Sequence, residues 1–350
     1  MKQFIGKSDS GNLKEALRGV GDPQLIIMIS NGAQFEKHVS ELQELYPNVP
    51  SIGTTGHFYS NKLKEGGVGI VAMSRVKAAA GVMDRASSAP ISGIANLEKN
   101  LRDVGASARD TAVIDFSTGN DAMVLTSMYS VLEKKEIQLM GGTAFDGMVS
   151  CNGVVYKDAA AYLVVKNLDG KVKTYKENIY QPLDDQRYIV SKADRARYYM
   201  GELNGKSAKQ VYMDLFHIPE KDISTQTFQN PFGKVAGDDI CIVSLKEPSG
   251  SGICCYRQVN DSDVLTMLQV GDVPSIVQDT ISQIKRDFTK ISGAFSVNCA
   301  FRYLYFSDLH YFDDYLKEMS QINGFCGFVG NGEHYNSRFV NQTMTCVVFE

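Results

Sequence analysis

The chain has 350 residues and a formal net charge of −4, and 43% of its residues are hydrophobic against 22% that are charged. This length suits two domains of ordinary size, and the composition is that of a globular protein with a sizeable core. The slightly acidic balance, without a long basic run, argues against a nucleic-acid-binding surface or a polybasic membrane patch. The apolar runs are far shorter than the ~20 residues that span a bilayer. The opening stretch MKQFIGKSDSGNLKEAL lacks the apolar centre of a secretory signal, so we expect a cytoplasmic protein.

Seven cysteines occur without a CxxC pair, which gives no support for a zinc ribbon or a thioredoxin-like motif. They are Cys151, Cys241, Cys254, Cys255, Cys299, Cys326 and Cys346. Most lie in apolar stretches, where a free cysteine behaves as a small hydrophobic residue. We therefore expect reduced thiols in the core and no bound metal.

In chain order, the pattern predicts a unit that occurs three times: an apolar strand, a helix, a glycine-rich turn, a polar stretch and a second apolar strand. The first strands are QLIIMIS (24–30), TAVIDFS (111–117) and FRYLYFS (301–307). The turns are SIGTTG (51–56), MGGTAFDG (140–147) and GFCGFVGNGE (324–333). The closing strands are GVGIVAM (67–73), DAAAYLVV (158–165) and TMTCVVF (343–349). Strands that alternate with helices on this spacing are typical of α/β proteins.

A different region lies between the second and third copies. KVKTYKENIYQPLDD (171–185) predicts a strand followed by a linker that contains Pro182 and two aspartates, and we place a domain boundary between residues 183 and 184. Further helices are predicted at 207–219 and 275–290, with a β-hairpin around KEPSGSG (246–252). The predicted fold is mixed α/β (α+β): mixed β-sheets flanked by helices, in two related halves that carry the repeated unit.

Two of the five histidines follow glycine turns in equivalent units. His57 comes after SIGTTG, and His334 comes after GNGE. If these turns face each other, the two imidazoles could line one cavity and ligate a haem or a metal. A lone histidine is more often a surface or hydrogen-bonded residue, so we keep haem as the alternative hypothesis.

Arg302 interrupts an apolar and aromatic run. It is either an outward residue of a strand or a buried cation, and Glu333 is the candidate partner in the second case. An unpaired guanidinium that faces a cavity would instead bind a ligand carboxylate through its fork. Along the last strand, alternation would place Asn341, Thr343 and Thr345 on one face, which would suit a small polar ligand as well as a solvent-exposed edge.

An enzyme is a further hypothesis, with Cys326 or Cys299 as nucleophile and a histidine as base. No histidine lies next to either thiol in sequence, and buried cysteines are usually inert. We therefore expect a protein without catalytic activity.

Six stretches, taken in order, carry a family resemblance. They are SIGTTG, MGGTAFD, GELNGKSAKQVYMDL, FSVNCAFR, GFCGFVGNGE and VNQTMTCVVF. These stretches resemble the FIST family (F-box and intracellular signal transduction). The first two take the places of the glycine turns of its N-terminal module, and the last four are similar to signatures of its C-terminal module. The resemblance covers nearly the whole chain. It implies an N-terminal FIST module over residues 1–183 and a C-terminal FIST module over residues 184–350.

The resemblance also implies a function. FIST proteins are sensory modules that bind small ligands, with amino acids proposed, and pass the signal to a partner such as a sensor kinase, whereas one branch binds haem and senses nitric oxide. The positions carried over by the resemblance are Arg302, Gly327, Gly332, Glu333, Asn341 and Thr343. Glycine turns supply backbone N–H groups and close approach to a ligand. For this reason the expected pocket also includes Gly53, Thr54, Thr55, Gly141 and Gly142. His57 and His334 depart from the family pattern and leave the ligand class open.

Overall fold

The computed structural model describes residues 1–63, 65–236 and 239–350. The chain divides into two compact units. Unit 1 consists of Met1–Glu177, Val277–Phe339 and Thr343–Glu350, and unit 2 consists of Asn178–Ile276 and Val340–Gln342. The two units are defined by contacts, whereas the predicted modules are defined by sequence signatures. The boundary between residues 183 and 184 therefore stays a prediction.

Unit 1 is built on three β-sheets, whose central strands are apolar runs buried on both faces. The first sheet, in spatial order, holds β1 (Lys2–Ser8), β5 (Val68–Ser74), β2 (Leu25–Ser30), β3 (Ser51–Thr55), β9 (Val149–Cys151) and β10 (Val154–Tyr156). The second holds β24 (Arg338–Val340), β23 (Glu333–Tyr335), β8 (Gln138–Thr143), β7 (Thr111–Ser117), β11 (Ala159–Asn167) and β6 (Val76–Asp84). The third holds β12 (Val172–Asn178), β25 (Thr343–Phe349), β21 (Gly293–Cys299), β22 (Phe325–Gly330) and β4 (His57–Tyr59).

The same pairing occurs in all three sheets. Strand β2 is parallel to β3 and antiparallel to β5, β7 is parallel to β8 and antiparallel to β11, and β21 is parallel to β22 and antiparallel to β25. Parallel neighbours need a crossover, which helices supply in each case. The predicted mixed α/β fold is confirmed. That the three sheets are copies of one unit stays a prediction.

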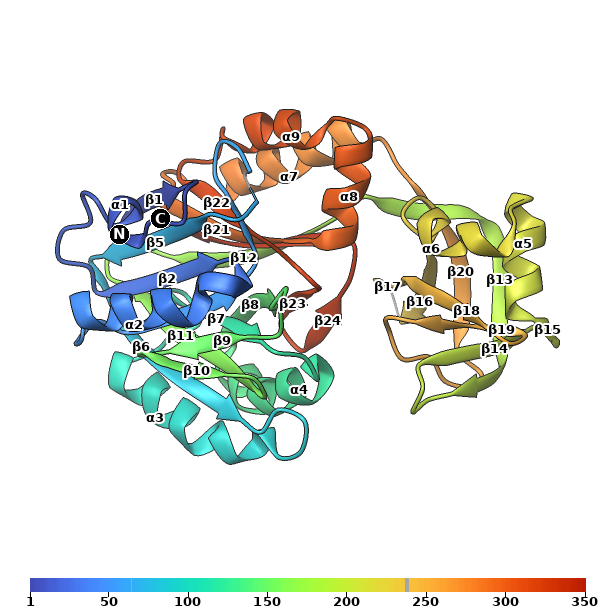
Figure 1. Cartoon of the computed structure of the whole chain (residues 1–350), viewed down its shortest axis with the longest axis horizontal. Helices are drawn as coiled ribbons and strands as arrows, with labels where there is room; N and C mark the ends of the chain where they lie inside the picture. The colour runs from blue at the N-terminus through green and yellow to red at the C-terminus, as the bar shows by residue number, and fades with distance from the viewer. Residues whose placement is uncertain (64, 237–238) are drawn as a thin grey trace. The chain divides into compact units, whose positions relative to one another are not determined.

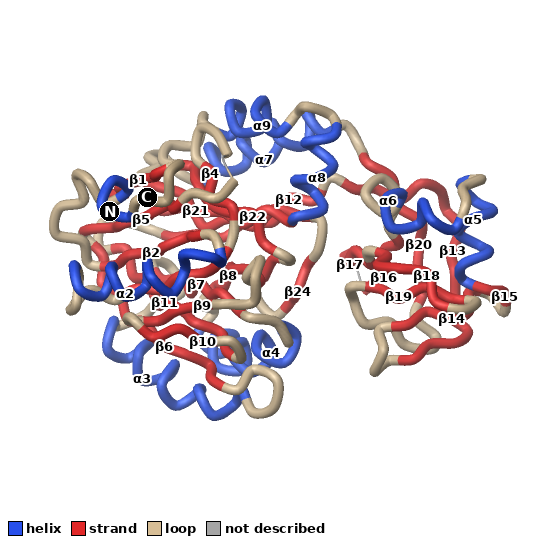
Figure 2. The backbone as a smooth tube through the Cα atoms, in the orientation of Figure 1, coloured by secondary structure: helices blue, strands red, loops and turns tan. Residues whose placement is uncertain are grey.

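Helices lie on the outside of unit 1, around the strands (Figure 2). Their bounds are α1 (Leu13–Ala16), α2 (Phe35–Leu45), α3 (Ile94–Val104), α4 (Asp121–Leu132), α7 (Val273–Asp287), α8 (Ala300–Asp308) and α9 (Phe312–Met319). Figure 1 shows α7, α8 and α9 on one side of the third sheet. On this helix side, the Tyr175 hydroxyl of β12 donates to Asp287 of α7 at 2.8 Å. The interior between the sheets is one apolar cluster that includes Ile29, Ile114 and Phe328.

The predicted strand at 301–307 is wrong, because these residues form helix α8. The strand of this region is β21, directly before the helix. An apolar and aromatic run fits either structure by composition. In the helix, Arg302 and Phe306 lie four residues apart on the buried face, while Leu304 between them is 42% exposed.

Unit 2 is rich in antiparallel strands. Its elements are β13 (Tyr180–Asp194), β14 (Tyr199–Leu203), β15 (Lys206–Ser207), α5 (Ala208–Phe216), α6 (Ile223–Gln226), β16 (Phe232–Ala236), β17 (Asp239–Val243), β18 (Leu245–Ser249), β19 (Gly252–Cys255) and β20 (Val264–Val270). A hairpin is present, formed by the antiparallel pair β18 and β19. The predicted loop is too long, because residues 246–249 belong to strand β18. The predicted linker is wrong: Pro182 lies in β13, which pairs with β20. The pairing register shifts between Pro182 and Arg187, so the polar turn residues form a bulge inside a strand.

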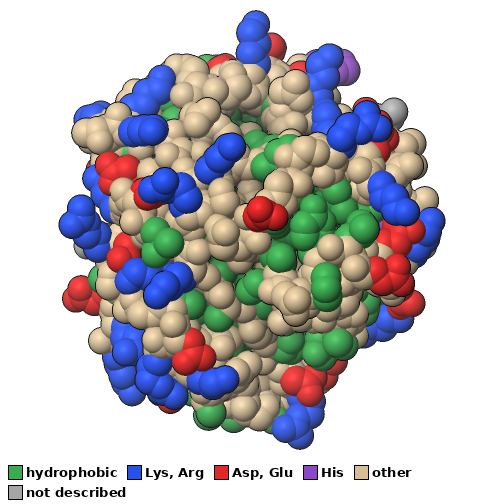
Figure 3. Space-filling model, turned by 90° about the vertical axis from the view of Figure 1, so that its left-hand side faces the viewer, with side chains coloured by type: hydrophobic (Ala, Val, Ile, Leu, Met, Phe, Trp, Pro, Cys, Tyr) green, Lys and Arg blue, Asp and Glu red, His purple; other side chains and the backbone are tan. Residues whose placement is uncertain are grey.

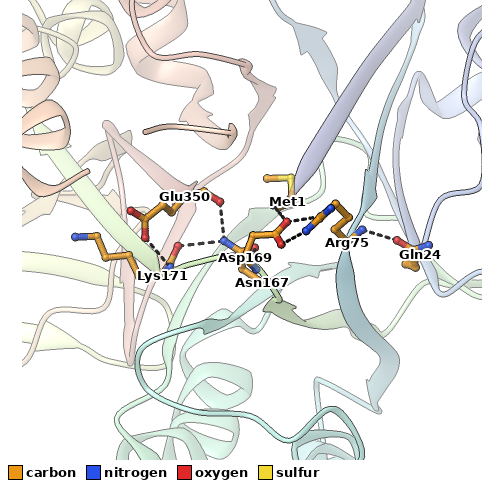
Figure 4. Close-up of polar contacts among 7 residues, drawn as sticks. All are labelled: Met1, Gln24, Arg75, Asn167, Asp169, Lys171 and Glu350. Carbon is orange, nitrogen blue, oxygen red and sulfur yellow. Dashed lines mark hydrogen bonds and ion pairs between the residues drawn. The ribbon is translucent and has the colours of Figure 1, made fainter. Parts of the chain in front are cut away.

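A polar network joins residues that are far apart in the sequence of unit 1 (Figure 4). The Arg75 Nε donates to Asp169 at 2.7 Å, and Asn167 Nδ2 donates to the backbone oxygen of Glu350 at 2.8 Å. The face of the molecule in Figure 3 carries basic and acidic side chains interspersed with hydrophobic ones. This mixture agrees with the weak net charge of the whole chain.

Candidate functional site

Most of the predicted glycine-turn residues lie at or near the carboxyl ends of the parallel strand pairs. Gly53, Thr54 and Thr55 are in β3, and Gly141 and Gly142 are in β8. In open α/β sheets, ligands bind beyond the carboxyl ends of strands. This position makes the strand ends the place to look for a site.

The three turn segments lie together. The backbone N–H of Phe145 donates to the oxygen of Thr55 at 2.9 Å, and that of Thr143 donates to Gly332 at 3.0 Å. Glu333 in β23 pairs with Gly142 in β8. The backbone bends of all three sheets therefore adjoin one another.

Two of these glycines allow close packing of backbone against backbone. A Cβ at Gly141 would lie 2.0 Å from the Asp115 oxygen, and a Cβ at Gly327 would lie 2.0 Å from the Ser296 oxygen. Since the neighbouring strands fill this space, both glycines are required by packing whether or not a ligand binds nearby.

Arg302 lies in the first turn of α8 and is fully buried. Its guanidinium forms an ion pair with Glu177 of β12. It also lies over the rings of Phe306 and Tyr315, at 4.8 and 5.1 Å from the ring centres. The expected ion-pair partner, Glu333, is thus replaced by Glu177. The strand order makes β12 the edge strand next to β25. Glu177 lies on the same face of β12 as Tyr175, which contacts helix α7, so its side chain faces the helices.

Tyr59, Asn298 and Tyr315 continue the polar contacts from this ion pair across the third sheet. Asn298 Nδ2 donates to the Tyr59 hydroxyl at 2.8 Å and lies 3.4 Å from the Tyr315 hydroxyl. The Tyr59 hydroxyl also contacts Ser296 at 2.8 Å. We use the name Arg302 site for the five residues Glu177, Arg302, Asn298, Tyr59 and Tyr315.

Two oxygen atoms in the Arg302 site stand out. Asn298 Oδ1 and Glu177 Oε2 are buried and accept no hydrogen bond from the described part of the chain. Buried polar groups in proteins are almost always hydrogen-bonded, so such atoms point to a bound water or ligand. Burial also raises the pKa of Tyr315 well above its usual value, which keeps this phenol neutral.

Glu333 lies in β23 and contacts Thr343, the first residue of β25. Its Oε2 accepts hydrogen bonds from the Thr343 N–H and hydroxyl, at 3.0 and 2.6 Å. Burial raises the pKa of Glu333 to about 8, although the hydrogen bonds from Thr343 favour the ionised form. Two predicted site residues, Glu333 and Thr343, thus bind each other.

His334 is fully buried between two carboxyl groups. Its Nδ1 donates to Asp115 at 2.8 Å, and its Nε2 donates to Asp121 at 3.0 Å. Burial alone would lower the pKa of His334, but the two aspartates raise it to about 10. With both ring nitrogens in hydrogen bonds, His334 has no lone pair to offer a haem iron.

His57 differs from His334. Its ring lies 4.7 Å from the ring of Phe145, and its buried Nδ1 has no hydrogen-bond partner among the residues that the structure describes. His57 pairs with Val329 in the third sheet, and Val329 pairs in turn with Asn298. Unlike His334, His57 thus has a buried ring nitrogen that no described residue occupies.

The predicted residue Asn341 belongs to unit 2, together with its neighbour Gln342. Gln342 is fully buried and accepts a hydrogen bond from Ser244 at 2.9 Å. Its Nε2 donates to Tyr180 and to the backbone of Thr227, at 3.1 and 2.9 Å. The polar residues before the last strand therefore anchor this segment in unit 2.

The cysteines are free thiols, and all but Cys254 are buried. Burial raises the pKa of the Cys326 thiol far above its usual value, so this sulfur is a poor nucleophile. Within the described ranges, no cluster of histidine, cysteine or acidic residues could hold a metal ion. No helix in the described part of the chain is long and apolar enough to cross a lipid bilayer.

A family model of the FIST N domain matches residues 24–206, which is more than half of the chain. The chain belongs to the FIST family. FIST domains are sensory domains of signal transduction and are generally not catalytic. A comparison with curated proteins gives no significant match. The C-terminal FIST module lies largely beyond the matched residues and stays a prediction.

Sequence reasoning missed much of the Arg302 site. Glu177, Asn298, Tyr59 and Tyr315 were not predicted, because their elements meet only in the folded sheet. The sequence did contain one indication of this partner. Glu177 is an acidic residue within a predicted strand, and a buried arginine requires an acidic partner.

Proposed function

We propose that this FIST protein is a non-enzymatic cytoplasmic sensor. It binds a small polar molecule, an amino acid or a related compound, at the Arg302 site and signals through a partner protein such as a sensor kinase. Burying an ion pair costs more free energy than burying apolar side chains of the same size. A fully buried Arg302–Glu177 pair beside unpartnered oxygens is therefore the observation that supports a recognition role.

The chemistry of arginine suits this role. A guanidinium binds a carboxylate through two parallel hydrogen bonds, and a water-excluded site strengthens this interaction. Phe306 and Tyr315 hold the guanidinium plane in place by stacking. The free thiols of the chain agree with a reducing compartment.

A thermal-shift screen over amino acids and organic acids tests the proposal. At a hundred times its Kd, a ligand should stabilise the protein by about 2.7 kcal/mol, which is several degrees in Tm. We expect Arg302→Lys to lose this shift, because lysine keeps the charge and loses the fork. Arg75→Lys is the matched control, since it changes an exposed Arg–Asp pair, and its shift should match the wild type. The proposal fails if no compound stabilises the wild type or if both variants respond alike.

Haem is the second candidate, favoured by the unpartnered Nδ1 of His57. Bound haem would supply the gas-binding iron, with His57 as the protein ligand. Reconstitution with haemin should then give a Soret band that His57→Ala removes and that His38→Ala, a control at a hydrogen-bonded histidine, retains. A wild-type protein without a Soret band excludes this candidate.

A further inference from the structure

The turn between β13 and β14 carries two arginines that have no acidic partner. Arg195 and Arg197 are exposed, and neither forms an ion pair with a residue that the structure describes. Asp194, next to them in the chain, is engaged by the backbone, because its Oδ1 accepts the N–H groups of Ala196 and Arg197 at 3.1 and 3.2 Å. The turn therefore presents two guanidinium groups that can bind an added anion.

Arg197 is held in place by a stack on the face of β14 that points away from the core of unit 2. Its guanidinium lies over the ring of Tyr199, 5.4 Å from the ring centre. The ring in turn lies against two buried glycines of the paired strands β14 and β19 (Figure 1), because a Cβ at Gly201 or Gly252 would come within 3.1 or 2.6 Å of it. A stacked guanidinium has fewer conformations to lose on binding than an ordinary surface arginine.

The backbone of the turn is fixed as well. The Cys255 N–H donates to the Tyr198 oxygen at 2.8 Å, and Gln258 Nε2 donates to the Arg195 oxygen at 3.2 Å. Tyr198 has a φ of 54°, which is unusual for a residue other than glycine, and its side chain is 41% exposed. These hydrogen bonds therefore hold a turn that exposes an aromatic side chain beside the arginines. Tyrosine and arginine are the residue types enriched at the centres of protein–protein interfaces.

Charge and size together indicate the occupant of this surface. An arginine fork binds a carboxylate through two parallel hydrogen bonds, and an exposed tyrosine adds apolar contact area. A nucleic acid suits the surface less, because its affinity comes from neutralising many phosphates and the chain as a whole has a net charge of −4. A short run of aspartates and glutamates needs only a few cations, which the turn supplies.

We propose that Arg195, Arg197 and Tyr198 form a docking surface for an acidic segment of a partner protein. This inference rests on the proposed function, which requires a partner, and it adds the surface and the chemistry that would recognise that partner. The docking surface belongs to unit 2, whereas Arg302 belongs to unit 1. Docking and small-ligand binding are therefore open to separate tests.

Fluorescence anisotropy with the full chain tests the docking surface. The probes are the fluorescein-labelled peptide Asp-Glu-Asp-Glu-Asp-Glu and its amide counterpart Asn-Gln-Asn-Gln-Asn-Gln, and we expect only the acidic peptide to bind. The double variant Arg195→Ala/Arg197→Ala should bind the acidic peptide about tenfold more weakly, because it loses two charged hydrogen-bond donors. Arg18→Ala/Arg102→Ala is the matched control, since it removes the same charge from exposed positions of unit 1, and it should keep the wild-type affinity.

Three results would overturn the proposal. The acidic peptide does not bind, the two double variants lose affinity equally, or a labelled single-stranded oligothymidylate binds the same arginines more tightly than the peptide does. Equal losses would indicate attraction by net charge alone, and the third result would indicate a nucleic-acid site. The thermal shift caused by a small ligand should be the same in Arg195→Ala/Arg197→Ala as in the wild type. A missing peptide signal beside an intact thermal shift thus rejects the docking surface and leaves the proposed ligand site in place.

Discussion

At the scale of single residues, the buried charges of unit 1 come in sets whose members are distant in sequence. Arg302 binds Glu177, and His334 binds Asp115 and Asp121. Each charge in such a set offsets the cost of removing its partner from water. Glu333 differs, because its direct partner Thr343 is neutral.

The pKa of Glu333 leads to a prediction about pH. Burial raises this pKa to about 8, from about 4.5 for an unperturbed glutamate. Between these values the folded protein holds a proton that the unfolded chain has released. Stability should therefore fall as pH rises from about 5 to about 8, by at most about 1.4 kcal/mol per pH unit from this group. Glu333→Gln, which mimics the protonated form, should remove this part of the slope.

The measurement is denaturant unfolding of both proteins between pH 5 and pH 9. The stability of Glu333→Gln relative to the wild type should increase with pH and level off above pH 8. Glu44→Gln is the control, because Glu44 is exposed on α2 and should give no trend. Parallel wild-type and Glu333→Gln curves would contradict the prediction.

Residue-level reasoning from sequence was partly successful at the site. The sequence indicated that a buried Arg302 needs an acidic partner, but the sequence alone could not identify Glu177 as that partner. Sequence distance gives no information here, because the side chains meet through the order of β12, β25 and β21. The ligand-binding role of Arg302 stays a prediction.

At the scale of elements, periodicity predicted the helices with a clear apolar stripe. α5 and α7 lie at the helices predicted over 207–219 and 275–290, and α2 and α9 lie between the strand and the glycine turn of their units, where the repeated unit predicts a helix. The strand prediction for 301–307 was wrong because nearly every residue there is aromatic or apolar. Such a pattern has no period that distinguishes a strand from a helix. Tertiary packing favours the helical structure of α8, because the helix packs Phe306 against Tyr311 and Tyr315.

The close strand packing at Gly327 leads to an element-level prediction. Gly327→Ala would add a methyl group 2.0 Å from the backbone oxygen of Ser296. Because a strand backbone cannot move aside, the variant should lose about 1–3 kcal/mol of stability. Gly21→Ala is the control, since a Cβ there meets no atom within 4 Å. Urea denaturation measures both, and equal stability of the two variants would show that β21 and β22 can separate.

At the scale of the whole molecule, the chain leaves unit 1 after Phe339, contributes three residues to unit 2 and returns at Thr343. Gln342 is held in unit 2 by three hydrogen bonds, and Thr343 is held in unit 1 by Glu333. Gln342 also has a φ of 55°, an unusual value for a residue other than glycine. One peptide bond thus connects two separately anchored residues.

Removal of the Gln342 side chain should therefore affect unit 2 first. Gln342→Ala leaves the buried Ser244 hydroxyl and the Thr227 carbonyl without this partner, at a cost of about 1–3 kcal/mol. Hydrogen exchange should show lower protection around α6 and β18, with β7 and β8 unchanged. Gln210→Ala, on the exposed side of α5, should change neither region. Loss of protection confined to unit 1 would contradict this assignment.

The arrangement of the third sheet has a consequence for biosynthesis. Strands β4 and β12 are made early, but β21, β22 and β25, which lie between them, are made only after unit 2. Domains fold as they emerge from the ribosome. Strand β12 therefore has no neighbouring strand in its sheet until unit 2 has been translated, and its edge stays unpaired during this time. The lysines at 171, 173 and 176 place positive charge at the start of β12 and within it. Such charges disfavour pairing with other chains until the sheet can close.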